Sequence, residues 1–377
     1  MKLQSITRLF VGLSSLLIAN LLMAQAVSLD RFDSVRPASD YQQAIDQSRA
    51  AIQVLLDAGA PGVSIAVGVD GELIWAEGFG FANVEYRAPV TTLTKFRIGS
   101  VSKSMTSIAL ARLYERGVID LDVPIQTYLN EFPVKEKGPI SLRLLASHRA
   151  GVRHYLPDGS DNLVKRHYDN VLDALEIFAD DPLIAVPGER YSYSSHGFNL
   201  LSAVLQEASG VEFITLMREQ VFSPLKLIDT VADHTDFIIE NRAAPYTRRG
   251  DGRLRNAPFV DNSYKWAGGG FLSTPSDLVK FGFGVFNSGL LKEETLQLLL
   301  SPPLLPNGTI ADQNYGLGWQ HYRQLGDWVG HGGGSVGGNS LFLVHREQNV
   351  VVAIACNLTG CLGANRELAE IANLFLD

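Results

Sequence analysis

The stretch "RIGSVSKSMTS", residues 97–107, places Ser100 three residues before Lys103, where a helix is expected to begin. The apolar residues that follow recur with the spacing of one buried helical face: Val101, Met105, Ile108 and Ala109. Gly117 then provides a C-terminal cap, so a helix is predicted from about Ser100 to Arg116. A serine is a poor nucleophile until a base removes its proton, and a lysine one helical turn away can bring its amine back to that serine. Ordinary helix starts contain the same residue types, so this spacing alone leaves both interpretations open.

The lysine sets a condition on its surroundings. A lysine acts as a base only when burial or a neighbouring cation lowers its pKa. If Lys103 is a base, its site is therefore partly desolvated and contains another polar group that shares the proton. Two later stretches are candidates for that group: "YSYSSHGFNLL", residues 191–201, and "GHGGGSVGG", residues 330–338.

Strand and helix signals along the chain predict the fold. Residues 40–58 are expected to be helical, and two strand-like runs then flank Asp70-Gly71, a strong hairpin signal. The middle of the chain is mainly helical, and short strand-like runs return before a last helix from about residue 362. These signals predict an α/β fold, with an antiparallel sheet flanked by helices and an inserted, mostly helical lobe. The expected α/β lobe covers about residues 30–120 and 305–377, and the helical lobe covers about residues 121–304.

The N-terminal segment has the features of a targeting sequence. Lys2 and Arg8 precede an apolar run, residues 9–23, and the A-x-A sequence at residues 24–26 offers a cleavage site. We interpret residues 1–26 as a signal peptide and expect an exported protein, periplasmic or secreted, with no membrane span after cleavage. A mitochondrial presequence is the alternative, although it should contain more arginine and a less continuous apolar run.

Composition and charge exclude several classes of partner. The chain has 377 residues, of which 46% are hydrophobic and 19% are charged, as in ordinary globular enzymes. Its formal charge of −8 becomes −10 when residues 1–26 are removed, because that segment contains two cations and no acidic residue. A protein this anionic is not expected to bind nucleic acid or an anionic membrane surface. We expect a small molecule or a peptide as its substrate, and the sequence does not indicate an oligomeric state.

The cysteines and histidines bear on disulfides and metals. Cys356 and Cys361, in "ACNLTGC", are the only cysteines, and they either form a bridge that closes a small loop or remain two buried thiols. The eight histidines form no H-E-x-x-H pattern or other metal-ligand spacing. We therefore expect no metal and no other cofactor.

Three ordered motifs resemble those of the serine β-lactamase and penicillin-binding superfamily: "SVSK" (100–103), "YSS" (193–195) and "HGG" (331–333). Their form is most similar to the class C β-lactamase branch with its esterases and D-peptidases. Further stretches resemble the same branch: "LLASHRAGV" (144–152), "YGLGW" (315–319) and "GGGFLSTPSDLVKF" (268–281). The stretches "HRAGVRHY" (148–155) and "VDNSYKWAGGGFLST" (260–274) resemble the serine β-lactamase-like proteins whose animal member is mitochondrial. The resemblance covers residues 27–377 and implies a β-lactamase/transpeptidase-like fold.

The resemblance also implies roles for the first two motifs. Ser100 and Lys103 match the nucleophile and its partner lysine. Tyr193 matches the tyrosine that shares the proton with that lysine. Tyr191 lies in the same stretch, but only Tyr193 keeps the spacing to the Gly-aromatic-x-Leu-Leu run that follows it.

The glycines of the third motif have a physical explanation. They are expected on an edge strand beside the nucleophile, where a side chain would block the approach of a substrate backbone. The resemblance implies that the N–H groups of Gly334 and Ser100 form the oxyanion hole and that Gly333 belongs to the same substrate-binding strand. A phosphate-binding loop is the alternative, but strands rather than a helix follow and no G-K-[ST] sequence is present.

Two residues depart from the family pattern. Ser195 stands where the family often has Asn, and a hydroxyl has less reach than an amide that holds both the lysine and a substrate amide. His331, which we count among the catalytic residues, stands where many β-lactamases have Lys. It would anchor a substrate carboxylate only in its charged form. Both departures favour an esterase or a peptidase over an efficient β-lactamase.

Several other basic residues are weaker candidates. Four arginines surround an Asp251-Gly252 turn and form either a flap that attracts acidic substrates or a solvated hairpin: Arg248, Arg249, Arg253 and Arg255. Three more basic residues either line the cleft or have structural roles: His148, Arg153 and His154.

The motifs together predict a cofactor-free serine hydrolase that forms an acyl-enzyme on an ester or a peptide. The family resemblance makes D-amino acid peptides a first candidate. The alternatives are a true β-lactamase, a covalent β-lactam sensor, and a non-catalytic binding or assembly protein on the same fold. The complete Ser100-Lys103-Tyr193 set argues against a binding protein, since nothing in the fold requires all three residues.

Overall fold

The computed structural model describes residues 39–305, 307–310, 314–362 and 366–376. The expected leader, residues 1–26, lies outside them. The α-helices are α1 (Gln42–Asp57), α2 (Val101–Glu115), α3 (Leu142–Ala146), α4 (Ser195–Ser209), α5 (Phe213–Met217), α6 (Trp266–Gly269), α7 (Pro275–Asn287), α8 (Glu293–Leu300) and α9 (Arg366–Asn373). The strands are β1 (Gly62–Val69), β2 (Glu72–Asn83), β3 (Ala88–Pro89), β4 (Phe96–Arg97), β5 (Val231–Ala232), β6 (Tyr246–Arg248), β7 (Leu254–Asn256), β8 (Phe271–Ser273), β9 (Gln320–Tyr322), β10 (Trp328–Ser335), β11 (Gly338–His345) and β12 (Val350–Cys356).

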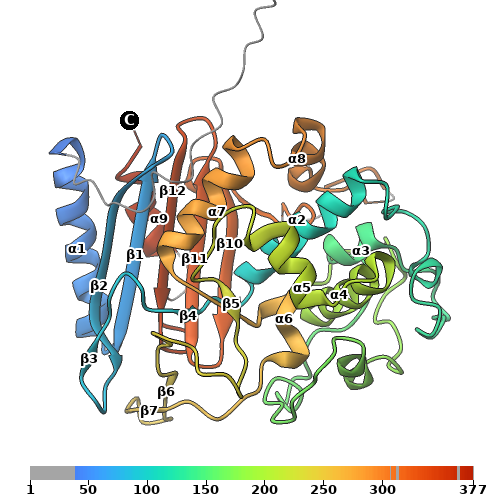
Figure 1. Cartoon of the computed structure of the whole chain (residues 1–377), viewed down its shortest axis with the longest axis horizontal. Helices are drawn as coiled ribbons and strands as arrows, with labels where there is room; N and C mark the ends of the chain where they lie inside the picture. Colours follow the sequence, from blue (N-terminus) through green and yellow to red (C-terminus); the bar gives the residue numbers. More distant parts are fainter. Residues whose placement is uncertain (1–38, 306, 311–313, 363–365, 377) are drawn as a thin grey trace, which may run out of the picture.

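A seven-stranded antiparallel sheet forms one side of the molecule (Figure 1). Its strand order is β3-β2-β1-β12-β11-β10-β9, so the two ends of the chain meet where β1 pairs with β12. The turn between β1 and β2 is the predicted hairpin. Asp70 and Gly71 both have the positive φ angles, 51° and 79°, that such a two-residue turn requires.

Alternating side chains give this sheet two buried faces. On β12, Val350, Val352 and Ile354 pack into the cluster that includes side chains of α1 and α9. Val351 and Ala353 point the other way, into the cluster that includes α2 and α7. Figure 1 shows the sheet lying between α1 and α7. The strands near the centre of the sheet are therefore apolar on both faces, which explains their nearly continuous hydrophobic sequence.

The residues between β4 and β8 form the mainly helical side of the molecule, where α3, α4 and α5 lie beside α2 (Figure 1). The predicted fold class, an antiparallel sheet flanked by helices with a helical insertion, is confirmed. The residue limits given for the two lobes stay a prediction. No single helix of the described residues is long and apolar enough to cross a membrane, and α4 with Phe213–Phe222 meets that criterion only as a pair bent by 85°.

Two alternatives left open by the sequence are decided by the structure. Cys356, at the end of β12, is joined to Cys361 by a disulfide. The arginine-rich stretch forms the two-stranded β6–β7 hairpin, with Arg253 paired to Asp251 and Arg248 donating to the Ala58 carbonyl. The hairpin interpretation of this stretch is therefore confirmed.

Candidate active site

Ser100 stands at the N-cap position of α2, with a φ of −65° and a ψ of −7°. Its hydroxyl makes no capping hydrogen bond, so Oγ remains available to other groups. The helix behind it is buried on every side from Val101 to Ala111, because it runs between the sheet and the helical side of the molecule. The predicted helix and its end are confirmed, with Gly117 in the left-handed conformation expected after the C-cap.

Lys103 lies one turn further on and is completely buried. Its Nζ is 3.1 Å from Ser100 Oγ, 3.1 Å from Ser195 Oγ and 2.5 Å from the Gly268 carbonyl oxygen. Burial, with a smaller contribution from the positive charge of Lys265, lowers the pKa of Lys103 well below its ordinary value. No carboxylate among the described residues forms an ion pair with it. These surroundings favour the neutral amine.

The three contacts of Lys103 match the valences of a neutral amine, which has two N–H groups and one lone pair. The Gly268 carbonyl can only accept a hydrogen bond, and Ser195 Oγ is able to accept the second. The lone pair is then left for the hydroxyl proton of Ser100. The geometry therefore suits a lysine that takes a proton from Ser100.

Tyr193 contacts both Ser100 and Lys103. Its Oη donates a hydrogen bond to Ser100 Oγ at 2.8 Å, and its ring centroid is 4.9 Å from Lys103 Nζ. Burial raises the pKa of Tyr193 far above its ordinary value, so the phenol keeps its proton. Lys103 is thus better suited than Tyr193 to take a proton in the resting state, and Tyr193 is suited to donate one.

Ser195, the first residue of α4, contacts Lys103 through its hydroxyl. The structure therefore places it in the site. Its short side chain accepts a hydrogen bond from Lys103, at the position where the family often has the longer asparagine.

The β10 strand brings the glycines of the third motif next to Ser100. A Cβ on Gly333 would overlap the carbonyl oxygen of Ile98, so only glycine lets β10 pack this closely against the turn that precedes Ser100. The structure thus gives Gly333 a packing role, and the substrate-binding role expected from the sequence stays a prediction. A Cβ on Gly334 would meet no described atom within 4 Å, and Gly334 itself lies against Gly99. Gly334 therefore faces open space next to the turn that precedes Ser100.

His331 does not have the environment that the sequence suggested. Its Nδ1 donates to the Gly332 carbonyl at 2.6 Å, and its Nε2 accepts from Tyr315 Oη at 2.8 Å. Burial lowers the pKa of His331 to about 3. The ring is neutral near pH 7 and both nitrogens are already engaged. The expectation of a charged, pH-dependent carboxylate anchor is therefore wrong, because it considered only an unperturbed histidine.

Several residues of the site were not assigned from sequence. The Gly268 carbonyl belongs to the "WAGGG" stretch, which was expected only to shape a turn, and Tyr315 opens the "YGLGW" stretch. Lys265 is also buried, and its Nζ lies 5.8 Å and 5.2 Å from the ring centroids of Tyr155 and Tyr264. Burial lowers the pKa of Lys265 to about 7. A glycine-rich run is a signal for close backbone approach, but a burial-dependent lysine leaves no sequence signature.

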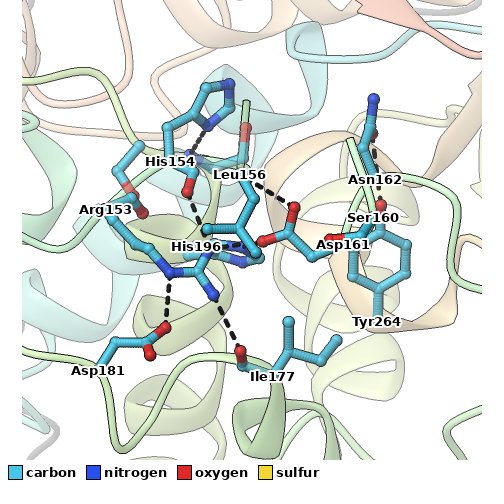
Figure 2. Close-up of polar contacts among 12 residues, drawn as sticks. Arg153, His154, Leu156, Ser160, Asp161, Asn162, Ile177, Asp181, His196 and Tyr264 are labelled. Atoms are coloured by element: carbon cyan, nitrogen blue, oxygen red, sulfur yellow. Dashed lines mark hydrogen bonds and ion pairs between the residues drawn. The ribbon is translucent and has the colours of Figure 1, made fainter. Parts of the chain in front are cut away.

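The three weaker basic candidates separate into two groups. His148 and His154 both lie beside Tyr193, with ring centroids 4.2 Å and 5.4 Å from that of the tyrosine. Arg153 instead pairs with Asp161 and Asp181 (Figure 2). Within the described ranges, no group of three or more His, Cys, Asp or Glu side chains is placed to hold a metal ion.

A serine oxygen within hydrogen-bond distance of both a buried amine and a phenol is an arrangement suited to acyl transfer. Residues 42–374 match the family described as Beta-lactamase. This chain belongs to the β-lactamase family. The resemblance drawn from the three motifs is confirmed, and the chain is assigned to the serine hydrolases of this superfamily.

Individual relatives of this β-lactamase family member are similar over most of their length. The serine beta-lactamase-like protein LACTB, mitochondrial, of Bos taurus is 33% identical over 444 residues, which cover 88% of this chain and 79% of the relative. The crystal structure of a D-amino acid amidase from Ochrobactrum anthropi SV3 has a TM-score of 0.76 and 25% identity, covering 89% of this chain and 98% of the amidase. A penicillin binding protein from Bacillus halodurans has a TM-score of 0.74 and 25% identity, covering 86% and 99%.

These relatives correct the expected location. The bovine protein is mitochondrial, whereas we expected a periplasmic or secreted protein, so the prediction of export is wrong. A short basic region followed by an apolar run does not separate an export signal from other N-terminal targeting segments. The prediction of export rested on this pattern.

Proposed function

We propose that this protein is a serine hydrolase that forms an acyl-enzyme at Ser100 and acts on an ester or a peptide. One observation carries the proposal: Lys103 Nζ and Tyr193 Oη both lie within hydrogen-bond distance of Ser100 Oγ, at 3.1 and 2.8 Å. The burial of Lys103 supports its role as the base, and the protonated phenol supports a donor role for Tyr193.

In the proposed acylation, Ser100 Oγ attacks the substrate carbonyl carbon while its proton passes to the lone pair of Lys103 Nζ. The carbonyl π electrons move to the oxygen, which the N–H groups of Ser100 and Gly334 stabilise. The carbonyl then re-forms and the bond to the leaving nitrogen or oxygen breaks. Tyr193 Oη gives that leaving atom a proton and takes the one held by Lys103.

Deacylation reverses these proton movements. A water molecule attacks the acyl carbonyl, and its proton reaches Lys103 through Tyr193. The ester bond to Ser100 Oγ breaks, and the serine oxygen takes the proton back. This route needs no separate carboxylate base, and its groups are those already placed on Ser100 Oγ.

The substrate proposal rests on the neutral His331 and on one relative. A neutral, fully engaged imidazole offers no cation to a substrate carboxylate, which argues against efficient turnover of penicillins and cephalosporins. The solved structure of similar fold and 25% identity is a D-amino acid amidase. We therefore favour esters and amides or peptides of D-amino acids whose recognition does not require a free carboxylate. The formal charge of −8 supports a small molecule or a peptide over nucleic acid.

Hydrolysis rates on a small panel test this assignment. We expect p-nitrophenyl acetate and D-phenylalanine amide to be hydrolysed by the wild type and not by Ser100→Ala. We expect a chromogenic cephalosporin to be turned over at least about tenfold less efficiently than the ester, because His331 provides no cation for its carboxylate. A kcat/KM for the cephalosporin far above that for the ester would instead identify a true β-lactamase. Unchanged ester hydrolysis by Ser100→Ala would refute the nucleophile.

A further inference from the structure

Two imidazole rings accept the backbone hydrogen bonds that follow Tyr193. The N–H of Ser194 donates to His148 Nδ1, and the N–H of Ser195 donates to His154 Nδ1, each at 3.1 Å. These are the two residues directly after Tyr193, at the start of α4. The two bonds therefore fix the backbone from which the phenol reaches Ser100.

His148 has an unfavourable backbone conformation and an unpaired ring nitrogen. It follows the C-cap of α3 with a φ of 57°, in the left-handed region that favours glycine. Its Nε2 is buried and has no hydrogen-bond partner among the described residues. A glycine would avoid both the backbone strain and the buried unpaired N–H group. Unfavourable features of this kind concentrate at functional positions, which directs attention to what the ring contacts.

The His148 ring packs among aromatic side chains of the site. The shortest of these contacts is with Tyr193, at 4.2 Å between ring centroids, and the others are with Tyr191, Phe198 and Tyr315. Burial lowers the pKa of His148 well below its ordinary value, and the charged forms of the neighbouring Lys103, His331 and His154 would lower it further. The ring is neutral, so Nδ1 keeps the lone pair that the Ser194 N–H needs.

His154 is held in place by a network of charged groups next to it in the chain. Figure 2 shows Arg153 between Asp161 and Asp181, with His196 of α4 bonded to Asp161. The Nε2 of His196 lies 3.0 Å from the carboxylate of Asp161. This network ties residues 153–161 to the first turn of α4, so the imidazole of His154 is fixed relative to the N–H that it receives.

We propose that His148 and His154 are positioning residues that hold Tyr193 Oη against Ser100 Oγ by accepting the N–H groups of Ser194 and Ser195. The proposal rests on the proposed function, because it assigns both histidines an effect that passes through the phenol. Neither ring has a hydrogen bond to Ser100 or Lys103, so neither is proposed to transfer the reacting proton.

A double-mutant cycle separates positioning from a structural role. The measured quantity is kcat/KM for D-phenylalanine amide, whose leaving nitrogen needs the proton of Tyr193, for His148→Ala in the wild-type and in the Tyr193→Phe backgrounds. We expect a loss of about 10²-fold when Tyr193 is present, as for a misplaced catalytic group, and less than about threefold when its hydroxyl is already absent. His148→Asn is the matched control, because asparagine keeps an acceptor near Nδ1 and tolerates the left-handed backbone. It should recover the rate to within about fivefold.

Equal losses in both backgrounds would overturn the proposal for His148, because a structural defect does not depend on the phenol. A thermal melt shows whether His148→Ala is folded. If it is not, the same cycle with His154→Leu and His154→Asn decides the proposal, and equal losses there overturn it. Failure of a fluorophosphonate to label the wild type at Ser100 would instead refute the proposed function, so the two failures are distinguishable.

Discussion

Replacing Lys103 with methionine removes the proposed base while keeping most of the side-chain volume. The buried amine has three contacts, with Ser100, Ser195 and the Gly268 carbonyl, and methionine provides none of them. Loss of a general base and of nucleophile activation costs about 10²- to 10⁴-fold in rate. We expect about a 10³-fold decrease in kcat/KM for p-nitrophenyl acetate, which corresponds to about 4 kcal/mol of barrier.

The fold should survive this change, because a buried carbonyl without a donor replaces a buried amine. The Gly268 carbonyl loses its donor at a cost of about 1–3 kcal/mol, while the protein no longer has to bury an amine. Lys103→Arg is the matched control: it keeps N–H donors at this position, but a guanidinium cannot take a proton near pH 8, so it should be as inactive as the methionine variant. Steady-state hydrolysis at pH 8 and a thermal melt measure both effects. A loss below tenfold in a folded Lys103→Met protein would mean that Lys103 is structural.

Three further outcomes follow from the same site. Tyr193→Phe should slow hydrolysis of D-phenylalanine amide by about 10²-fold or more but affect p-nitrophenyl acetate less, because a nitrophenolate leaves without a proton; equal losses would contradict a donor role. Lys265→Met should move the acid limb of kcat/KM to higher pH by about half a unit or more, and Lys265→Arg should not, because the cation lowers the pKa of the catalytic lysine. The native pKa values of His148 and His331 are lowered, so only the unfolded chain takes up their protons as pH falls below 6.5 and stability is lost there. When the pH falls from 7.5 to 5.5, each of these two rings should lower the free energy of unfolding by about 1.4 kcal/mol. Asp277, whose pKa is raised to about 6, should increase it by about 1 kcal/mol over the same range. Urea unfolding that is equally stable at both pH values would contradict the neutral burial of these rings.

The parts of the fold that local sequence determines were predictable. The Asp70-Gly71 hairpin needs two residues that tolerate positive φ, and the end of α2 needs Gly117 for the same reason. The Ser100–Lys103 spacing also lies within one helical turn, so the sequence alone brings these two residues together. The third partner, Tyr193, came only from the resemblance to a family, because 93 residues separate it from Ser100.

The features that were missed depend on tertiary burial. His331 is neutral because Tyr315 and the Gly332 carbonyl engage its two nitrogens in a dry site. The Gly268 carbonyl contacts Lys103 across 165 residues, and no residue type marks a carbonyl as functional. The sequence therefore suggested an unperturbed histidine at position 331 and only a turn around Gly268. Their actual environments depend on the packing of distant parts of the chain.

The central claim is that Ser100 is the nucleophile, and covalent labelling tests it without knowledge of the substrate. The native protein is incubated with a fluorophosphonate, digested, and the modified peptide is identified by mass spectrometry. We expect a single adduct on the peptide that contains Ser100, at a rate that falls steeply in Lys103→Met, and no adduct in Ser100→Ala. Modification of another serine, or undiminished labelling of Ser100→Ala, would contradict the account.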